Sequence, residues 1–303
     1  MKSALFISFF MTSVLGADLR ISPSLQKTVD SAVANTVSAF AQKQLKPEEL
    51  ALTLYDLGDA SAVQSASHRG DVRIYPASVV KLFYLEAAHR WMEDGKISDS
   101  AELRRATRDM IVDSSNDATH YVIDLVTGTT SGPELPASEM ADWGNKRNAI
   151  NRYFASQGHS DINVNQKPWC EGPYGRERVF VGEKYGNRNA LTTDATARLL
   201  SSIVLGQCVS QKRSAEMLDL LKRDPSGQVS DPDDQAHGFT ARALPPGSKL
   251  WSKAGWTSDT RHDAAYIELP NGKKLILVIF TVKHANEREI IPALAKNVFR
   301  AFE

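Results

Sequence analysis

An α+β fold is predicted by three features of the sequence: a strand pair near the N-terminus, three strand-like segments near the C-terminus, and a helix-rich stretch between them. Strands at the two ends of one chain bury their apolar faces by pairing with each other. We therefore expect one antiparallel sheet of about five strands, flanked by terminal helices, with an all-helical lobe inserted between strands 2 and 3.

The sheet lobe is expected over residues 20–75 and 225–303. Apolar residues at helical spacing over 24–46 predict an amphipathic helix. The alternating run over 50–59 predicts a strand that returns as a hairpin through 63–65. Near the C-terminus we expect strands over 249–256, 263–269 and 274–282 and a closing helix over 287–302.

The helical lobe is expected over residues 76–224, where the period changes from that of strands to that of helices. Helices are predicted over 101–112, 117–126, 139–157, 193–204 and 213–221. The chain is 42% hydrophobic, and no linker rich in Gly, Ser or Pro divides it. A single catalytic domain is therefore expected over 17–303.

Residues 1–16 have the composition of a secretory signal peptide. Lys2 precedes the apolar run 4–11, and small residues follow at Gly16 and Ala17. The run is too short to span a bilayer as a stable helix. We expect an exported protein, periplasmic or secreted, with a retained N-terminal anchor as the alternative.

The charge balance excludes several kinds of partner. Lys and Arg total 36, as do Asp and Glu, so no net field favours nucleic acid or an anionic membrane. A small-molecule substrate is the expected partner. The seven histidines lack metal-ligand spacing, so we expect no metal and no cofactor. Cys170 and Cys208 could form one disulfide in an oxidising compartment, a question that the sequence leaves open.

Ser78 and Lys81 are the first candidate catalytic pair. Pro76 suits the start of a helix, and an apolar run follows Ser78 without Gly or Pro until Gly95. Lys81 lies three residues on, on the same helical face. Desolvation in apolar surroundings lowers the pKa of a lysine, and a neutral amine can take a proton from a serine.

Ser-x-x-Lys is a weak pattern by itself, because Ser24 and Lys27 form a second copy. That copy opens a polar, amphipathic segment and is read as an ordinary helix start. The position of Ser78 at the start of an apolar helix in mid-chain separates the two copies.

Two further stretches could complete a site. Ser114 and Asn116 offer a hydroxyl and an amide in a polar turn, although a simple helix cap would use the same residue types. Lys253 and Gly255 lie on a predicted strand, where an ammonium could reach an anion and a glycine lets a ligand approach the backbone. A solvated lysine on an edge strand is the alternative.

These three motifs occur in an order that resembles the class A β-lactamase family of penicillin-recognising serine hydrolases. The resemblance covers about residues 45–303 and includes 189–197, which looks like the end of the family's omega loop. It implies a β-lactamase/transpeptidase-like fold. It also implies that Ser78 is acylated, that Lys81 transfers its proton, that Ser114 relays a proton to the leaving nitrogen and that Asn116 binds the substrate amide.

The same resemblance implies a carboxylate-binding role for Lys253, with Gly255 beside the substrate. The oxyanion hole would consist of the backbone N–H groups of Ser78 and Trp256. Arg261 is a candidate second anchor for the carboxylate, because guanidinium pairs with carboxylate in a bidentate way.

The sequence departs from the family pattern at several positions. Ala254 replaces a hydroxyl, Trp256 is bulky, and Ser115 stands where an aspartate is usual. The glutamate that activates the deacylating water has no clean counterpart. An ungapped count selects Glu177, with Glu171 and Glu183 as alternatives, whereas a surface ion pair with the neighbouring arginines would also explain Glu177.

The sequence therefore predicts a serine hydrolase of class A β-lactamase type, which would serve in antibiotic resistance by opening a β-lactam through a Ser78 acyl-enzyme. Two alternatives remain at this point. One is a related esterase, amidase or peptidase with a different substrate. The other is a penicillin-binding module that acylates with little turnover.

Overall fold

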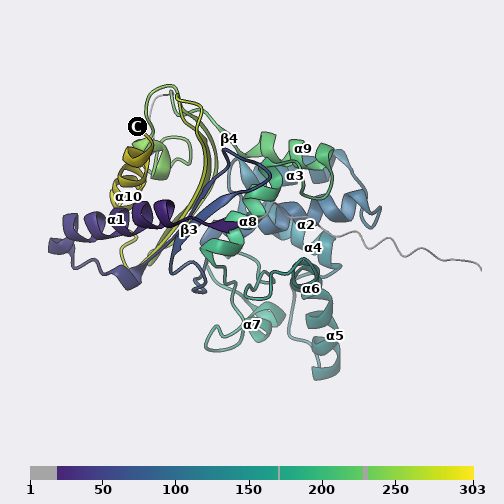
Figure 1. Ribbon diagram of the computed structural model, residues 1–303. Coiled ribbons are helices and arrows are strands. Elements are labelled where there is room, and N and C mark those ends of the chain that lie inside the picture. Colours follow the sequence, from purple (N-terminus) through teal and green to yellow (C-terminus); the bar gives the residue numbers. More distant parts are fainter. Residues whose placement is uncertain (1–18, 170, 228–230) are drawn as a thin grey trace, which may run out of the picture.

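The computed structural model describes residues 19–169, 171–227 and 231–303, and within them the chain forms an α+β fold built on one seven-stranded sheet (Figure 1). The strand order is β1-β3-β2-β7-β6-β5-β4. The strands are β1 (Arg20–Ile21), β2 (Leu50–Asp56), β3 (Gln64–His68), β4 (Lys222–Arg223), β5 (Lys249–Trp256), β6 (Thr260–Glu268) and β7 (Lys274–Val282).

The predicted fold class is confirmed in general terms, but the number of strands was wrong. Five of the seven strands correspond to the expected ones. The other two, β1 and β4, contain two residues each and lie at the two edges of the sheet. A two-residue strand shows no alternation of apolar and polar residues, so no periodic pattern could have revealed it.

The strands pair antiparallel, except that β1 runs parallel to β3. The register aligns one residue from each of the five longer strands in a row across the sheet. Lys253 lies opposite Ala264, which lies opposite Val278, which lies opposite Thr53. On the far side of Thr53 the row ends at Ser67. This row places a lysine at one side of the sheet and two hydroxyl groups at the other.

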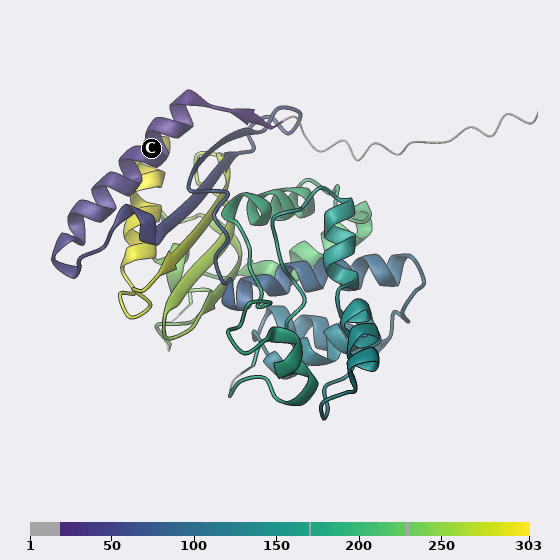
Figure 2. The ribbon, with the colours of Figure 1, turned by 90° about the horizontal axis from the view of Figure 1, so that it is seen from below.

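Helices cover both faces of the sheet. Figures 1 and 2 show α1 (Pro23–Ala39) and α10 (Ile290–Phe299) together on one face, with the other helices across the sheet from them. These others are α2 (Lys81–Glu93), α3 (Ala101–Ile111), α4 (Asn116–Thr127), α5 (Ala137–Arg147), α6 (Ala149–Ser156), α7 (Gly175–Val181), α8 (Thr193–Val204) and α9 (Gln211–Leu221). Short 3₁₀ turns are η1 (Ala41–Lys43), η2 (Pro47–Glu49), η3 (Ala77–Val80), η4 (Phe239–Ala243) and η5 (Arg300–Phe302).

Two apolar cores hold these layers together. One core lies between the sheet and α1 and α10, where Leu52 and Leu277 meet Leu294. The other lies between the sheet and the helical lobe, where Val278 and Phe280 meet Phe83. Strands β2 and β7 at the centre of the sheet are buried on both faces, and β7 accordingly carries a continuous apolar run over 275–280.

Three helical segments differ from the expectation. The first helix ends at Ala39 instead of near residue 46, because the chain continues as a 3₁₀ turn and Gln44 adopts a left-handed conformation with φ of 58°. The helix predicted over 139–157 is two helices that meet at Asn148. The backbone N–H and the side-chain amide of Asn148 both donate to the carbonyl of Gly144. Helix α7 was not predicted.

The two ends of the segment between Gln166 and Asn189 are hydrogen-bonded to each other. The side chain of Asn189 accepts from the backbone N–H groups of Asn165 and Gln166 and donates to the carbonyl of Gln166. The hydroxyl of Tyr84, which is buried in α2, also donates to the carbonyl of Gln166. These bonds pin both ends of a long surface loop that contains α7.

Several expectations concern residues outside the described ranges. The predicted signal peptide at 1–16 lies there, and so does Cys170. Cys208 is buried and is a free thiol among the described residues, and the disulfide considered from the sequence lies outside them because it involves Cys170. Among the helices that the structure describes, none combines the length and apolarity needed to cross a membrane.

Candidate active site

Ser78 lies in a strained turn where the chain leaves the sheet lobe. It belongs to η3, and the α-helix proper begins at Lys81, so Ser78 precedes the first α-helical turn in which it was expected. Ala77 has φ of 46°, a left-handed conformation that is costly for a residue with a side chain. His262, on β6, lies 2.8 Å from the carbonyl of Tyr75 through Nε2 and accepts from the backbone of Thr281 through Nδ1.

These two contacts of His262 require the tautomer in which Nε2 carries the proton. Burial lowers the pKa of His262 to about 4, so the ring is neutral at physiological pH. The turn before Ser78 is therefore attached to the sheet by a neutral histidine. Sequence reasoning missed this residue, because its partner is distant in the chain.

Gly255 lets strand β5 pass against the backbone of Ser78. A Cβ atom at position 255 would lie 2.5 Å from the backbone nitrogen of Ser78 and 2.8 Å from that of Val79. Real side chains do not tolerate such distances, so only glycine fits without displacing one element. The close approach places the β5 edge, including the exposed residue Trp256, beside the Ser78 N–H group.

Ser114 lies between two buried lysines. Lys81 Nζ donates to the Ser114 carbonyl at 2.6 Å and lies 3.3 Å from its hydroxyl oxygen. Lys253 Nζ lies 3.0 Å from the same hydroxyl oxygen. Ser114 has φ of 54°, so its backbone is also in the left-handed region.

Asn116 begins α4 and is a further partner of Lys81, with its Oδ1 at 2.8 Å from Nζ. The neighbouring Ser115 has a different role. Its hydroxyl accepts from the backbone N–H of Ala118 and caps α4. Within one tight turn the chain therefore places two residues on Lys81 and one residue on the helix end.

Lys253 is fully buried and is bound by neutral oxygen atoms. Besides Ser114, Nζ donates to Gln235 Oε1 at 2.6 Å and to the Ala254 carbonyl at 2.7 Å. Burial, followed by the positive charges of Lys81 and Arg223, lowers the pKa of Lys253 well below its usual value. An anion bound here would offset this loss of solvation, because an opposite charge stabilises the ammonium form.

Gln235 connects the two sides of this cluster. Its Oε1 accepts from Lys253 Nζ and, at 3.0 Å, from the backbone N–H of Ala254. Its amide nitrogen donates at 3.1 Å to the carbonyl of Val112, just before the Ser114 turn. Sequence reasoning missed Gln235 because it lies in a polar loop without a motif. The absence of a hydroxyl at Ala254 was the available signal that another residue must bind here.

Trp256 and Arg261 are directly paired in the β5–β6 ladder but differ in environment. Trp256 is 40% exposed, and its ring lies 5.6 Å from that of Phe239. Arg261 is buried, forms an ion pair with Asp233 at 2.8 Å and stacks over Phe239. Nη1 of its guanidinium is therefore bound to a carboxylate of the protein, whereas Nε and Nη2 have no hydrogen-bond partner among the described residues.

Glu177 lies in a buried ion-pair network on α7. Arg147 binds both of its carboxylate oxygens, at 2.8 and 2.9 Å, and the Ser131 hydroxyl donates to it at 2.9 Å. Lys167, 3.7 Å from Glu177, binds Asp124 in turn. We call Asp124, Ser131, Arg147, Lys167 and Glu177 the Arg147 cluster. Two carboxylates balance two cations within it.

We call Ser78, Lys81, Ser114, Asn116 and Lys253 the serine cluster, and its Asn116 shares helix α4 with Asp124 of the Arg147 cluster. Asp124 lies two turns along α4 from Asn116, which corresponds to roughly 12 Å. With its oxygens bound by Arg147 and Ser131, Glu177 has the environment of a structural residue. The structure therefore does not support Glu177 as a base that holds water at Ser78. Glu171 and Glu183 are both exposed.

An aromatic segment instead lies against α4 near Asn116. His120, one helical turn after Asn116 and on the same face, contacts the carbonyl of Pro168 at 2.7 Å through Nε2. The His120 ring also packs on Trp169, with ring centroids 4.5 Å apart. This part of the loop therefore presents a proline and a tryptophan to the α4 face that carries Asn116.

The site combines a serine in a strained turn, two buried lysines that share a second serine, and a glycine-lined strand edge. The fold and this site define the class that contains the β-lactamases and the penicillin-binding proteins. The sequence matches the β-lactamase enzyme family over residues 32–302. The chain belongs to that family, whose members are hydrolases.

Solved structures share the fold at low identity. A β-lactamase from Sphaerobacter thermophilus is 21% identical, with a TM-score of 0.63 and coverage of 89% of this chain and 97% of its own. A β-lactamase from Xanthomonas campestris is 16% identical, with a TM-score of 0.65 and coverage of 92% and 99%. A mutant of PBP-A, solved as an acyl-enzyme complex with penicillin G, is 18% identical, with a TM-score of 0.64 and coverage of 93% and 97%. No curated protein matches the chain.

Proposed function

We propose that this protein is a serine hydrolase of class A β-lactamase type that acts on an amide bond such as that of a β-lactam and forms an ester at Ser78. The observation that carries the proposal is the sharing of the Ser114 hydroxyl by Lys81 and Lys253 beside the Ser78 turn. Such an arrangement provides a path for protons between a nucleophile and a leaving group.

The reaction begins when Ser78 Oγ attacks the carbonyl carbon and its proton passes to Lys81 in the amine form. The carbonyl oxygen becomes an oxyanion, for which the backbone N–H groups of Ser78 and Trp256 are the donors in our proposal. The carbon–nitrogen bond then breaks. The leaving nitrogen takes a proton from the Ser114 hydroxyl, which regains one from Lys81, and an ester of Ser78 remains.

A substrate with a carboxylate fits the charge of this site. Lys253 is buried among three neutral oxygens, so an anion placed beside it gains a strong charge-assisted interaction. The same placement would orient the scissile bond toward Ser78. Asn116, which is bound to Lys81, would face the amide side chain of the substrate.

A second candidate function is favoured by the environment of Glu177. A penicillin-binding protein that acylates but deacylates slowly needs Ser78 and both lysines. It needs no base to activate the water that hydrolyses the ester. Arg147 binds both carboxylate oxygens of Glu177, and the loop places Trp169 near Asn116. In this second candidate function, hydrolysis of the ester is slow compared with its formation.

A related esterase, amidase or peptidase is the third candidate. Ala254 and the exposed Trp256 alter the strand edge against which a substrate would lie. For each of these activities we propose export to the periplasm or the medium, based on the composition of residues 1–16.

Incubation with a fluorescent penicillin followed by mass spectrometry tests the proposal. An adduct on Ser78 is expected, and Ser78→Ala should remove it. A stable adduct without hydrolysis would identify the slow acylating protein. The absence of an adduct across several β-lactams, together with turnover of a simple ester, would favour the third candidate.

A further inference from the structure

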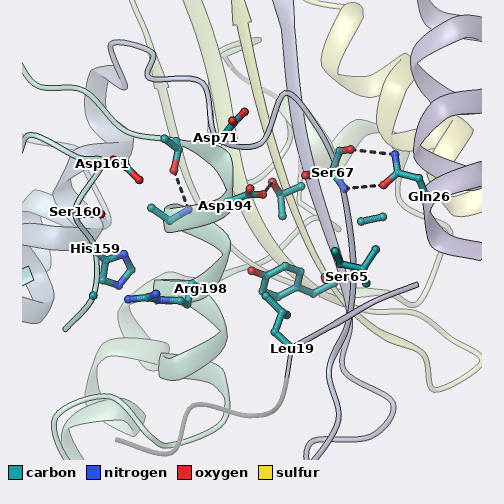
Figure 3. A pocket seen from close by; sticks show the side chains of 17 residues that line it. Leu19, Gln26, Ser65, Ser67, Asp71, His159, Ser160, Asp161, Asp194 and Arg198 are labelled. Carbon is teal, nitrogen blue, oxygen red and sulfur yellow. Dashed lines mark hydrogen bonds between the residues drawn. The ribbon is translucent and has the colours of Figure 1, made fainter. Parts of the chain in front are cut away.

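A cavity of about 410 Å³ lies at the β3 side of the sheet, away from the serine cluster. Strands β2 and β3, helix α8 and the loop after α6 form its walls (Figure 3). Its volume lies in the range typical of sites for small organic molecules. The nucleophile, both lysines and Ser114 are not among the residues that line it.

The cross-strand row shows how far this cavity lies from Lys253. Thr53 and Ser67, which line the cavity, occupy the same row as Lys253. Apolar residues at Ala264 and Val278 lie between them. Four strand spacings separate Ser67 from Lys253, or roughly 19 Å. A molecule in the cavity would therefore not touch the strand lysine.

The charged lining of the cavity is predominantly acidic. Asp71, Asp161 and Asp194 line it together with one cation, Arg198. In the view of Figure 3, Asp71 and Asp161 lie above His159 and Arg198. Burial lowers the pKa of His159 to about 4, so this histidine is neutral at pH 7. The carboxylates therefore outnumber the positive charges.

Asp194 is held against the backbone of Gly70. Its backbone N–H donates to the Gly70 carbonyl, and a Cβ at position 70 would lie 2.2 Å from Asp194 Oδ1. The Thr53 hydroxyl donates to the same oxygen at 2.6 Å. Burial and the charge of Asp71 raise the pKa of Asp194 above its usual value. A cation beside this carboxylate would offset both the loss of solvation and the repulsion from Asp71.

Tyr55 is a second, independent sign of a ligand. Its side chain lines the cavity and is only 3% exposed. Within the described part of the chain its hydroxyl makes no hydrogen bond. The hydroxyl oxygen is not among the fully buried polar atoms that lack a partner, so it keeps contact with the open space of the cavity. A polar ligand in the cavity would supply a hydrogen-bond partner.

The remaining lining gives the ligand an apolar part. Leu19 and Ile21 are large hydrophobic residues at the mouth, 48% and 83% exposed, and Ala66 lies within the wall. The described residues contain no group of His, Cys, Asp and Glu side chains suited to hold a metal ion. An organic cation with an apolar body matches this combination better than an inorganic cation.

We propose that the cavity binds a small primary amine, with its ammonium group between Asp71 and Asp194 and its apolar part against Leu19 and Ile21. The hydroxyl of Tyr55 accepts one of the ammonium hydrogens. The site is separate from the proposed catalytic site, and its occupation does not depend on acylation of Ser78.

Three probes of nearly the same shape test this proposal by calorimetry and NMR titration on the intact protein: benzylamine, benzyl alcohol and benzoate. Benzylamine should bind in a saturable way. The neutral and anionic probes should bind at least roughly 10-fold more weakly than benzylamine. Equal binding of amine and alcohol would overturn the proposal, because the carboxylates would then contribute nothing.

Variants locate the bound amine. Asp71→Asn and Asp194→Asn should each weaken benzylamine binding by roughly 10-fold. Asp71 is exposed, so its replacement tests the site even if Asp194→Asn fails to fold. Asp142→Asn, on the exposed side of α5, removes the same charge elsewhere and should leave binding unchanged. An equal loss of benzylamine affinity in Asp142→Asn and Asp71→Asn would show that only the overall charge of the protein matters. That result would overturn the proposed site.

A competition experiment separates this proposal from the proposed function. Ser78→Ala should bind benzylamine as the parent protein does, and saturating benzylamine should not slow labelling by a fluorescent penicillin. Loss of labelling in proportion to bound amine would place the amine at the serine cluster and overturn the location. If the protein is not labelled by any penicillin, the titrations with Asp71→Asn still decide the proposal.

Discussion

The hydroxyl of Ser114 lies within hydrogen-bond distance of two lysines, and this geometry restricts its own proton. When both lysines donate to the oxygen, the hydroxyl proton must point away from both ammonium groups. When either amine is neutral, the serine can donate to it. The lowered pKa of Lys253 favours this second state. Proton transfer through Ser114 therefore needs only small rearrangements.

Lys81→Met should abolish acylation of Ser78 while the protein remains folded. The lysine is fully buried, and methionine has a similar length without a proton-accepting group. We expect the acylation rate to fall by roughly 10²- to 10⁴-fold, the size of a lost general base. Mass spectrometry of the penicillin adduct measures the rate, and circular dichroism checks the fold. Unchanged acylation would remove Lys81 from the mechanism.

Gln235→Glu should weaken the binding of anionic substrates. A carboxylate at this position would contact Lys253 where the amide oxygen now lies, and it would neutralise the charge that attracts the substrate. The KM for an anionic β-lactam should rise roughly 10-fold, whereas an uncharged ester substrate should be much less affected. Equal effects on both substrates would show that Gln235 supports only the structure of the site.

At the level of single elements, α7 and the loop around it are attached to the lobe by a buried ion pair. Removing one partner of such a pair leaves an uncompensated charge, which costs about 3–5 kcal/mol. Glu177→Gln should therefore lower the free energy of unfolding by about this amount, measured by urea denaturation. Glu183→Gln, an exposed residue of the same loop, is the matched control.

The same variant tests the role that the sequence suggested for Glu177. A general base would show itself by accumulation of the acyl-enzyme and by a fall in turnover of roughly 10²-fold with little loss of stability. The contacts with Arg147 predict the reverse pattern. Accumulated ester in a protein of parental stability would contradict our interpretation of the Arg147 cluster.

The close approach of β5 to η3 leads to a prediction about the rate of acylation. Gly255→Ala places a methyl group 2.5 Å from the Ser78 nitrogen, so the strand or the turn must shift. Acylation should slow by roughly 10-fold or more, because small displacements of reacting groups are costly. Gly186→Ala is the control, since a Cβ there would meet nothing within 4 Å. Equal acylation rates in the two variants would show that the approach is not needed.

The stability of the whole molecule should depend on the protonation of Glu86. This residue is buried in α2, accepts from the Tyr153 hydroxyl of α6 at 2.8 Å, and burial raises its pKa to about 7. A raised pKa means that the folded protein binds more protons than the unfolded chain between about pH 4.5 and 7. Its contribution to stability is therefore complete below pH 4.5 and is lost as the pH rises through 7.

Glu86→Gln removes this dependence because glutamine is neutral at every pH. The difference in free energy of unfolding between variant and parent should change between pH 4.5 and pH 8 by on the order of 3 kcal/mol, in favour of the variant at high pH. Urea denaturation at several pH values measures this difference. Glu134→Gln, an exposed replacement, should show no such trend. A difference that stays constant with pH would show that Glu86 titrates normally.

Much of the fold could be predicted because the periodicity of apolar residues is a local property. The strands over 249–256 and 274–282 and the helix over 193–204 have the predicted bounds. The two-residue strands and the break at Asn148 were not predicted, because neither leaves a repeated pattern in the sequence. The order of the three motifs also lies in the sequence itself, and it indicated the family that the comparison then established.

Only the tertiary structure decided which side chains meet. Gln235 reaches Lys253 across a loop without a motif, and Glu177 is bound by Arg147, which lies 30 residues away in the chain. The amine cavity combines Tyr55 of β2 with Asp194 of α8, which the sequence separates widely. Desolvation and charge depend on neighbours in space, whereas a linear pattern records neighbours along the chain. For this reason the sequence by itself determined the secondary-structure elements and the order of the motifs. Packing determined which side chains contact each other, how deeply they are buried and how they are protonated.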